Sequence, residues 1–186
     1  KINTNWKFLI ENFIEPYHVQ FVHKTTTNQP LKDHYTVVDG ICYGSGVNVG
    51  EEDSKNTSAL SVTSRYLSLF PNFIIGTYFP NQIGVYLNIP ISPGITSQKR
   101  IIYTTDGKNM SKEEIKMVKN IWWNVHKEDH EMCERLQEGR SSPASDEGGL
   151  LSPIWEKGVQ AFQKLIIQGI MKSSKSIKRK QNVKRN

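Results

Sequence analysis

The hydrophobic period of this 186-residue chain changes near residue 111. Before that point, short segments alternate apolar and polar residues, as half-buried strands do, and residues 83–89 are the clearest example. After it, apolar residues recur at the three- and four-residue spacing of helices, over 115–125 and 155–170. This order predicts an α+β fold in which long helices cover one face of an antiparallel sheet.

Turn residues divide the first part of the chain into strands. A tight turn at Asp39-Gly40 predicts a hairpin of strands at 35–38 and 41–49. Further strands are predicted at 66–70, 72–79, 83–89 and 99–105, and Pro71 separates the first two of these. The run Gly44-Ser45-Gly46 opens no helix, so it predicts a bulge or a closely packed strand rather than a phosphate-binding loop.

Two helices are predicted in the second part of the chain. Ser111 and Glu114 form a capping box for the first helix, which we expect to end near Gly139. The second helix is predicted to start at Ser152-Pro153, because proline is well tolerated at the first helical position.

The N-terminal segment contains a histidine pair. We expect a short strand at the start of the chain, followed by a helical segment over Glu11–His23 in which Pro16 bends the helix or begins a new one. His18 and His23 lie five residues apart in it, and imidazoles are ligands for iron, zinc, copper and nickel. On a regular helix the two would be about 140° apart, so they can share one ion only if the helix is distorted or ends between them. Spacing alone leaves two unrelated histidines as an equally good interpretation.

Composition excludes several classes of protein. The net charge of +6 belongs to residues 172–186, which contain seven basic residues and no acidic one, leaving −1 for the remainder. We expect this segment to be a solvated, disordered tail and not a nucleic-acid site, because no stacking aromatic residues accompany it. No apolar run is long enough to span a membrane. Cys42 and Cys133 form no metal-binding pair, and two free thiols favour a cytoplasmic location.

The residues around the histidine pair are more specific than its spacing. They are Asn5-Trp6-Lys7, Glu11-Asn12-Phe13, Glu15 and Tyr17-His18-x4-His23. This string resembles the iron-binding segment of Rieske-type non-haem iron oxygenase α subunits, the ring-hydroxylating and amine-demethylating family. A downstream stretch is similar to the one that supplies the family's third iron ligand, and it consists of Glu128-Asp129, Glu134, Gln137 and Gly139.

This resemblance implies a mononuclear-iron catalytic domain over residues 1–171 with the helix-grip fold, a curved antiparallel sheet packed against long helices as in START and Bet v 1 domains. It also implies that His18, His23 and Asp129 bind Fe(II), leaving coordination positions for O2 and a small organic substrate that is hydroxylated or demethylated. The rival carboxylates and imidazole in the same turn are Glu128, His130 and Glu131.

Two further residues receive roles from the resemblance. Glu15 is expected to hydrogen-bond a ligand histidine and to link the iron to a Rieske cluster in a neighbouring subunit, although many relatives have Asp there. Asn12 is expected near the iron without binding it. His34 and His126 are not expected to be ligands. We expect Trp122 and Trp123 in the core and at its rim, with Phe73 and Val125 as possible pocket residues.

The family's α subunits also carry a Rieske domain, whose cluster needs C-x-H and C-x-x-H pairs, and this chain contains neither. We therefore expect the chain to be either a portion of a longer protein or a natural truncation. The [2Fe-2S] cluster is expected on a separate or missing domain, with a reductase or ferredoxin as electron donor and a homo-oligomer, a trimer, at full length. The alternative functions are a helix-grip ligand-binding module without redox activity and a zinc-dependent hydrolase.

Overall fold

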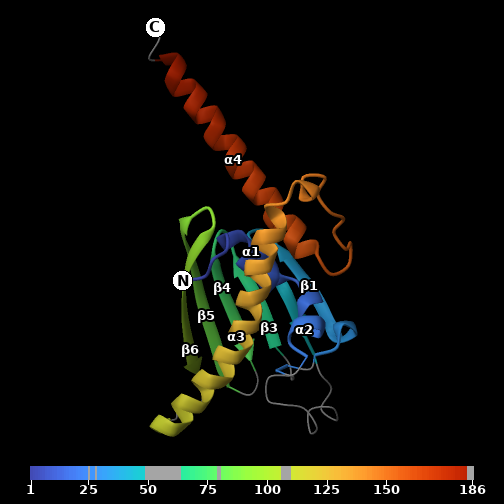
Figure 1. The fold of residues 1–186 in the computed structure, drawn as a ribbon, viewed down its shortest axis with the longest axis vertical. Helices are drawn as coiled ribbons and strands as arrows, with labels where there is room; N and C mark the ends of the chain where they lie inside the picture. The colour runs from blue at the N-terminus through green and yellow to red at the C-terminus, as the bar shows by residue number, and fades with distance from the viewer. Residues whose placement is uncertain (25, 28, 49–63, 79–80, 106–109, 184–186) are drawn as a thin grey trace.

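The computed structural model describes residues 1–24, 26–27, 29–48, 64–78, 81–105 and 110–183. Its sheet has six antiparallel strands, and each strand pairs with the next one in sequence (Figure 1). The strands are β1 (His34–Asp39), β2 (Cys42–Val47), β3 (Ser64–Leu69), β4 (Phe73–Tyr78), β5 (Gln82–Ser92) and β6 (Ile95–Thr104). The helices are α1 (Trp6–Ile14), α2 (Tyr17–Val22), α3 (Lys112–Arg140) and α4 (Lys157–Val183), with short 3-10 turns at Leu31–Asp33 and Pro143–Ser145.

The helices cover one face of the sheet, which confirms the predicted α+β, helix-grip arrangement (Figure 1). α3 crosses the sheet, and both α1 and α2 contact α3. α1 also packs against β2, β3 and β5, and the first turns of α4 pack against β1 and β2. The strand register brings Tyr86 opposite Ile74 on β4 and opposite Arg100 on β6. Because side chains alternate between the faces of a sheet, these three residues share the helix-covered face.

Aromatic rings dominate the core between sheet and helices. Phe162 of α4 is fully buried, and its ring centroid lies 5.8 Å from that of Trp6, 5.7 Å from that of Tyr43 and 6.2 Å from that of Phe70. Further along the sheet, Gly76 leaves the space that the Tyr78 side chain occupies, since a Cβ atom there would lie 2.1 Å from the Tyr78 hydroxyl oxygen. This absence of a side chain lets the tyrosine ring lie along the sheet.

Several predicted elements agree with the structure. The capping box at Ser111 and Glu114 is formed, and α3 ends at Arg140, one residue beyond the predicted end. The run Gly44-Ser45-Gly46 lies in β2 without a bulge, which confirms the closely packed strand. The hairpin turn is shifted by one residue, because Asp39 pairs with Cys42 and leaves Gly40 and Ile41 as the loop.

Other boundaries were predicted wrongly. The chain does not open with a strand: only Ile2 pairs, in an isolated bridge to Thr96, and α1 begins at Trp6 instead of residue 11. The cause is Asn5, whose side chain accepts a hydrogen bond from the Lys7 backbone N–H and caps the helix early. Strand β5 extends to Ser92, and β6 begins already at Ile95, because the hairpin that they form continues well beyond the alternating residues.

The second C-terminal helix also begins later than predicted. Ser152 starts a separate turn, in which its hydroxyl accepts hydrogen bonds from the backbone N–H groups of Ile154 and Trp155, and α4 begins at Lys157. At its other end α4 continues to Val183, so residue 171, the predicted end of the catalytic domain, lies inside a helix. The division of the chain at that residue stays a prediction.

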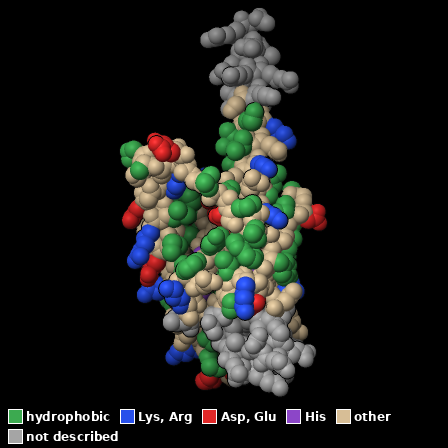
Figure 2. Space-filling view, turned by 90° about the vertical axis from the view of Figure 1, so that its right-hand side faces the viewer, with side chains coloured by type: hydrophobic (Ala, Val, Ile, Leu, Met, Phe, Trp, Pro, Cys, Tyr) green, Lys and Arg blue, Asp and Glu red, His purple; other side chains and the backbone are tan. Residues whose placement is uncertain are grey.

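α4 extends away from the body of the molecule in both views (Figures 1 and 2). Apolar side chains remain exposed along its described part, namely Ile167, Ile170 and Met171. None of the described helices is both long and apolar enough to cross a membrane.

Candidate metal centre

The break between α1 and α2 positions the histidine pair. Proline disfavours helical backbone at the residue before it, and Glu15, which precedes Pro16, has the extended values φ −101° and ψ 142°. The next helix, α2, starts at Tyr17 and ends at Val22, so His23 lies just beyond its last residue. The helix thus ends between His18 and His23, which is one of the two conditions that the spacing required. Their ring centroids lie 5.1 Å apart.

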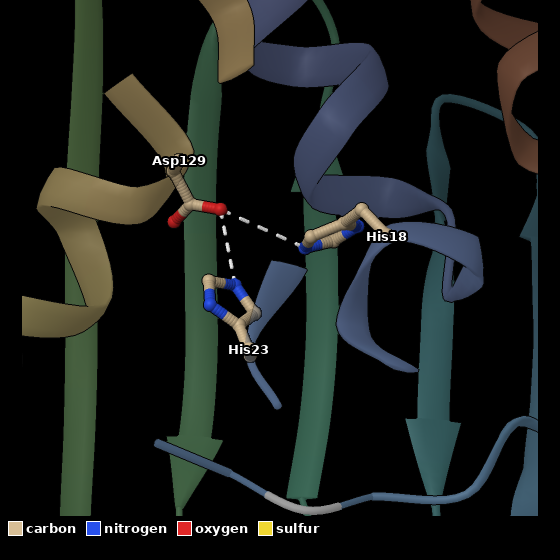
Figure 3. A group of neighbouring side chains, drawn as sticks. All are labelled: His18, His23 and Asp129. Carbon is tan, nitrogen blue, oxygen red and sulfur yellow. Dashed lines mark ion pairs between the residues drawn. The ribbon is translucent and has the colours of Figure 1, made fainter. Parts of the chain in front are cut away.

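Asp129 reaches the histidines from α3, more than a hundred residues later in the sequence (Figure 3). Its Oδ1 atom lies 3.1 Å from Nε2 of His23 and 3.7 Å from Nε2 of His18. One potential ligand atom from each of the three residues lies within 4.8 Å of the others, as is required to bind a single ion. The rivals Glu128, His130 and Glu131 are not part of this group.

Each member of the group has its own hydrogen-bond partner. Nδ1 of His18 lies 2.8 Å from Oε1 of Glu15, and Nδ1 of His23 lies 2.7 Å from Oε2 of Glu128. A histidine that donates its Nδ1 proton to a carboxylate keeps the Nε2 lone pair for a metal. The amide of Asn12 donates to Oδ1 of Asp129 at 2.9 Å. All three side chains are therefore fixed in orientation.

Charge attraction dominates the protonation of the group. Burial raises the pKa of Asp129, but the hydrogen bond from His23 and the nearby positive charges outweigh it and lower that pKa to about 2. Burial likewise lowers the pKa of His23, while Asp129 and Glu128 raise it to a net value above the ordinary one. Asp129 is consequently a carboxylate at neutral pH, the form in which it can bind a cation.

The group lies at one side of a cavity between the sheet and helices α1 to α3. The cavity holds about 730 Å³ of empty space, including its open mouth. Five aromatic rings line it, from Phe13, Tyr66, Tyr78, Tyr86 and Trp122. Burial raises the pKa of Tyr86 to about 12 and that of Tyr78 well above 10, so both hydroxyl groups stay protonated. The walls are thus mainly apolar and uncharged.

The structure places most of the predicted residues at this site. Glu15 and Asn12 contact the group as described, and Val125, but not Phe73, lines the cavity. His34 is buried outside it. His126 lines the cavity but lies outside the metal-binding group. Trp122 lines the cavity and belongs to the core, whereas Trp123 is exposed.

Two functional candidates were missed from the sequence. Glu128 was considered only as a rival ligand, yet it holds His23, and it also accepts a hydrogen bond from Thr26 at 2.8 Å. Arg100 lines the cavity and was not considered at all. Its position opposite Tyr86 follows from the strand register, which the alternation of residues 83–89 did not specify.

The chain belongs to the family described as ring hydroxylating alpha subunit (catalytic domain), whose model matches residues 1–170. Among curated proteins it is similar to the chloroplastic choline monooxygenase of Atriplex hortensis, with 28% identity over 162 residues. It is also similar to that of Amaranthus tricolor, with 27% identity over 169 residues. Both alignments cover 87% of this chain but 36% of the relative, so the chain spans about a third of the length of these relatives.

Solved structures show the same fold. A quaternary ammonium Rieske monooxygenase aligns with a TM-score of 0.70 and 20% identity, over 90% of this chain and 47% of the other. Dicamba monooxygenase bound to 3,6-dichlorosalicylic acid aligns with a TM-score of 0.65 and 13% identity, over 92% of this chain and 58% of the other. At these identities the similarity establishes the fold of the domain.

Proposed function

We propose that this chain is the catalytic domain of an iron-dependent oxygenase in which His18, His23 and Asp129 bind one Fe(II) ion. The observation that carries the proposal is the convergence of these three side chains in a buried cavity. Two imidazoles and one carboxylate on one side of an ion form the facial triad of non-haem iron oxygenases. Membership of the ring hydroxylating alpha subunit family supports the same assignment.

The geometry of the residues fits such an ion. Both Nε2 atoms and Oδ1 of Asp129 approach a common point, although Asp129 now pairs directly with His23. Each histidine has a carboxylate behind it, at Glu15 and Glu128, which selects the tautomer with a free Nε2. This second layer distinguishes a built metal site from a chance cluster of titratable groups.

Iron bound here would supply the activation of O2 for oxidation of a substrate C–H bond. The protein's own residues would hold the reactants and control access. Asn12 keeps Asp129 turned toward the histidines, and Glu15 and Glu128 prevent rotation of the two imidazoles. The rings of Tyr78 and Trp122, whose centroids are 4.3 Å apart, would give the substrate an apolar surface in the same cavity.

The electron source belongs to the proposal as well. A Rieske [2Fe-2S] cluster on another domain or subunit, reduced by a reductase or ferredoxin, would deliver electrons near Glu15, in an assembly that we propose to be a homotrimer. Glu15 supports this route because its carboxylate contacts His18 directly and is one of the residues that line the cavity. The cytoplasmic location predicted from the sequence stays a prediction, and the choline monooxygenases named above are chloroplastic.

Anaerobic reconstitution with Fe(II) tests the metal site. Wild type should bind one equivalent of iron, and His18→Ala, His23→Ala and Asp129→Ala should each lose most of it. Glu131→Ala is the matched control, because Glu131 lies two residues from Asp129 on α3 and is exposed. Equal iron binding by all the variants would refute the proposal. Zinc binding with ester or amide hydrolysis, without any effect of iron, would favour the hydrolase alternative.

A further inference from the structure

Arg100 places a positive charge in the cavity wall without a close ion-pair partner among the described residues. None of the ion pairs among the described residues includes Arg100. Its guanidinium carbon lies 5.0 Å from the centroid of the Tyr86 ring, over which it stacks. Burying a guanidinium without a counter-ion is costly, so a cation at this position calls for an anionic partner.

The hydrogen bonds of Arg100 leave one of its nitrogens unused. Nε donates to Oε1 of Gln98, and Nη2 lies 3.2 Å from Nε2 of His130. Nη1 is buried and has no hydrogen-bond partner among the described residues. Asn88 has a second donor without an acceptor: its Oδ1 accepts from Gln98, but its Nδ2 group is buried without a described partner. The protein around Arg100 therefore has more donors than acceptors.

The charged side chains that line the cavity also favour an anionic ligand. Apart from histidines, they are the carboxylates of Glu15 and Asp129 and the guanidinium of Arg100. A divalent ion at the proposed metal centre would balance the two carboxylates. Among the lining residues, Arg100 would then carry the one charge that the ion does not balance, and this favours a ligand with a negative charge.

We infer that Arg100 is the binding site for a carboxylate group of the substrate, with the aromatic walls holding the remainder of the molecule. The inference rests on the proposed function, since it names the substrate class of the same cavity. A carboxylate offers a guanidinium a negative charge and two acceptor oxygens, whereas a neutral amide offers no charge and one acceptor oxygen. Choline has no carboxylate, so it would lack this contact.

Paired probes that differ only in charge test this directly. The first pair is benzoate and benzamide, and the second is γ-butyrobetaine and its primary amide. Dissociation constants are measured by calorimetry or by the fluorescence of the tryptophans, with and without Fe(II), under anaerobic conditions. Wild type should bind at least one of the two acids about tenfold or more tightly than its amide, as expected for a charged hydrogen-bonded pair.

The variants separate the role of Arg100 from general effects. Arg100→Gln should reduce the preference for the acid to less than about threefold, and Arg100→Lys should retain part of it. Arg65→Gln is the matched control, because Arg65 lies in the same sheet and bonds Asn48 and the Val47 carbonyl outside the cavity. It should keep the wild-type preference, and circular dichroism checks the folding of each variant.

The outcomes distinguish this inference from the proposed function. Acid and amide binding equally to wild type, or neither acid binding at all, overturns the carboxylate site, even if iron binds normally. Retention of the full preference in folded Arg100→Gln also overturns it. A wild-type preference for the acid that is lost in Arg100→Gln, in a protein that binds no iron, supports the carboxylate site while refuting the metal centre.

Discussion

Removal of the Glu128 carboxylate should weaken the proposed iron site although Glu128 is not a ligand. Its Oε2 atom lies 2.7 Å from Nδ1 of His23 and also accepts a hydrogen bond from Thr26. Without it, the His23 ring is free to rotate. The neutral imidazole can then also carry its proton on Nε2, which prevents that nitrogen from binding a metal. Carboxylates that orient ligand histidines typically contribute about 10- to 100-fold to metal affinity, or about 1.4 to 2.7 kcal/mol.

The solvent exposure of each carboxylate narrows the expected loss of Fe(II) affinity. The Glu128 side chain is 28% exposed, so water can partly replace it, and we expect a loss near tenfold for Glu128→Ala. The Glu15 side chain is 12% exposed, so Glu15→Ala should cost more than Glu128→Ala. The comparison of the two variants therefore tests the physical reason as well as the contact itself.

Competition with a chromophoric chelator under anaerobic conditions measures the Fe(II) affinity of each variant. Glu131→Ala is again the control and should change the affinity by less than twofold, because its pairing partner, Lys127, is as exposed as Glu131 itself. The reasoning is refuted if Glu128→Ala binds Fe(II) as tightly as wild type while Asp129→Ala does not.

Three further predictions concern stability. Burial and the charge of His18 lower the pKa of His34 to about 4, so the unfolded chain gains a proton more readily than the folded one below pH 6.5. His34 thus destabilises the fold as the pH falls from 6.5 to 4. Between pH 7 and pH 5, the unfolding free energy of His34→Phe, measured in urea, should fall by about 2 kcal/mol less than that of wild type. An equal fall in both proteins would contradict this prediction. Phe162→Ala should lower the unfolding free energy by about 3 to 5 kcal/mol, whereas Gln160→Ala, exposed on the same helix, should change it by less than about 0.5 kcal/mol. Gly44→Ala should cost about 2 kcal/mol or more, because its Cβ would lie 1.9 Å from the Tyr66 carbonyl oxygen, while Gly94→Ala, with open space, should be nearly neutral in thermal unfolding.

The outline of the fold could be read from local patterns. Alternation over 83–89, the capping box at Ser111 and the helical spacing of 115–125 each depend on residues a few positions apart. Such signals predicted β5 and α3 in type and approximate place. Boundaries were harder to predict, because a single capping side chain such as Asn5 moved the start of α1 by five residues.

The candidate site could be predicted only in part. The string around His18 and His23 indicated an iron site through its resemblance to a known family, and Pro16 indicated where the helix would break. Asp129 was favoured over its rivals by the same resemblance, and a local signal was left unused: Asp129 lies seven residues after Trp122 and four after Val125, which are both buried. The same spacing does not reveal that Glu128, one residue earlier, would reach His23.

Local patterns indicated most of the strands and helices and the place of the histidine pair, because these properties follow from neighbours along the chain. Which side chains meet depends instead on the packing of whole elements. Asp129 joins His18 and His23 through the packing of α3 on α1 and α2. Arg100 enters the cavity through the register of β5 and β6, which sets one residue opposite another across the sheet. Such long-range contacts depend on how whole elements pack, which no local pattern specifies.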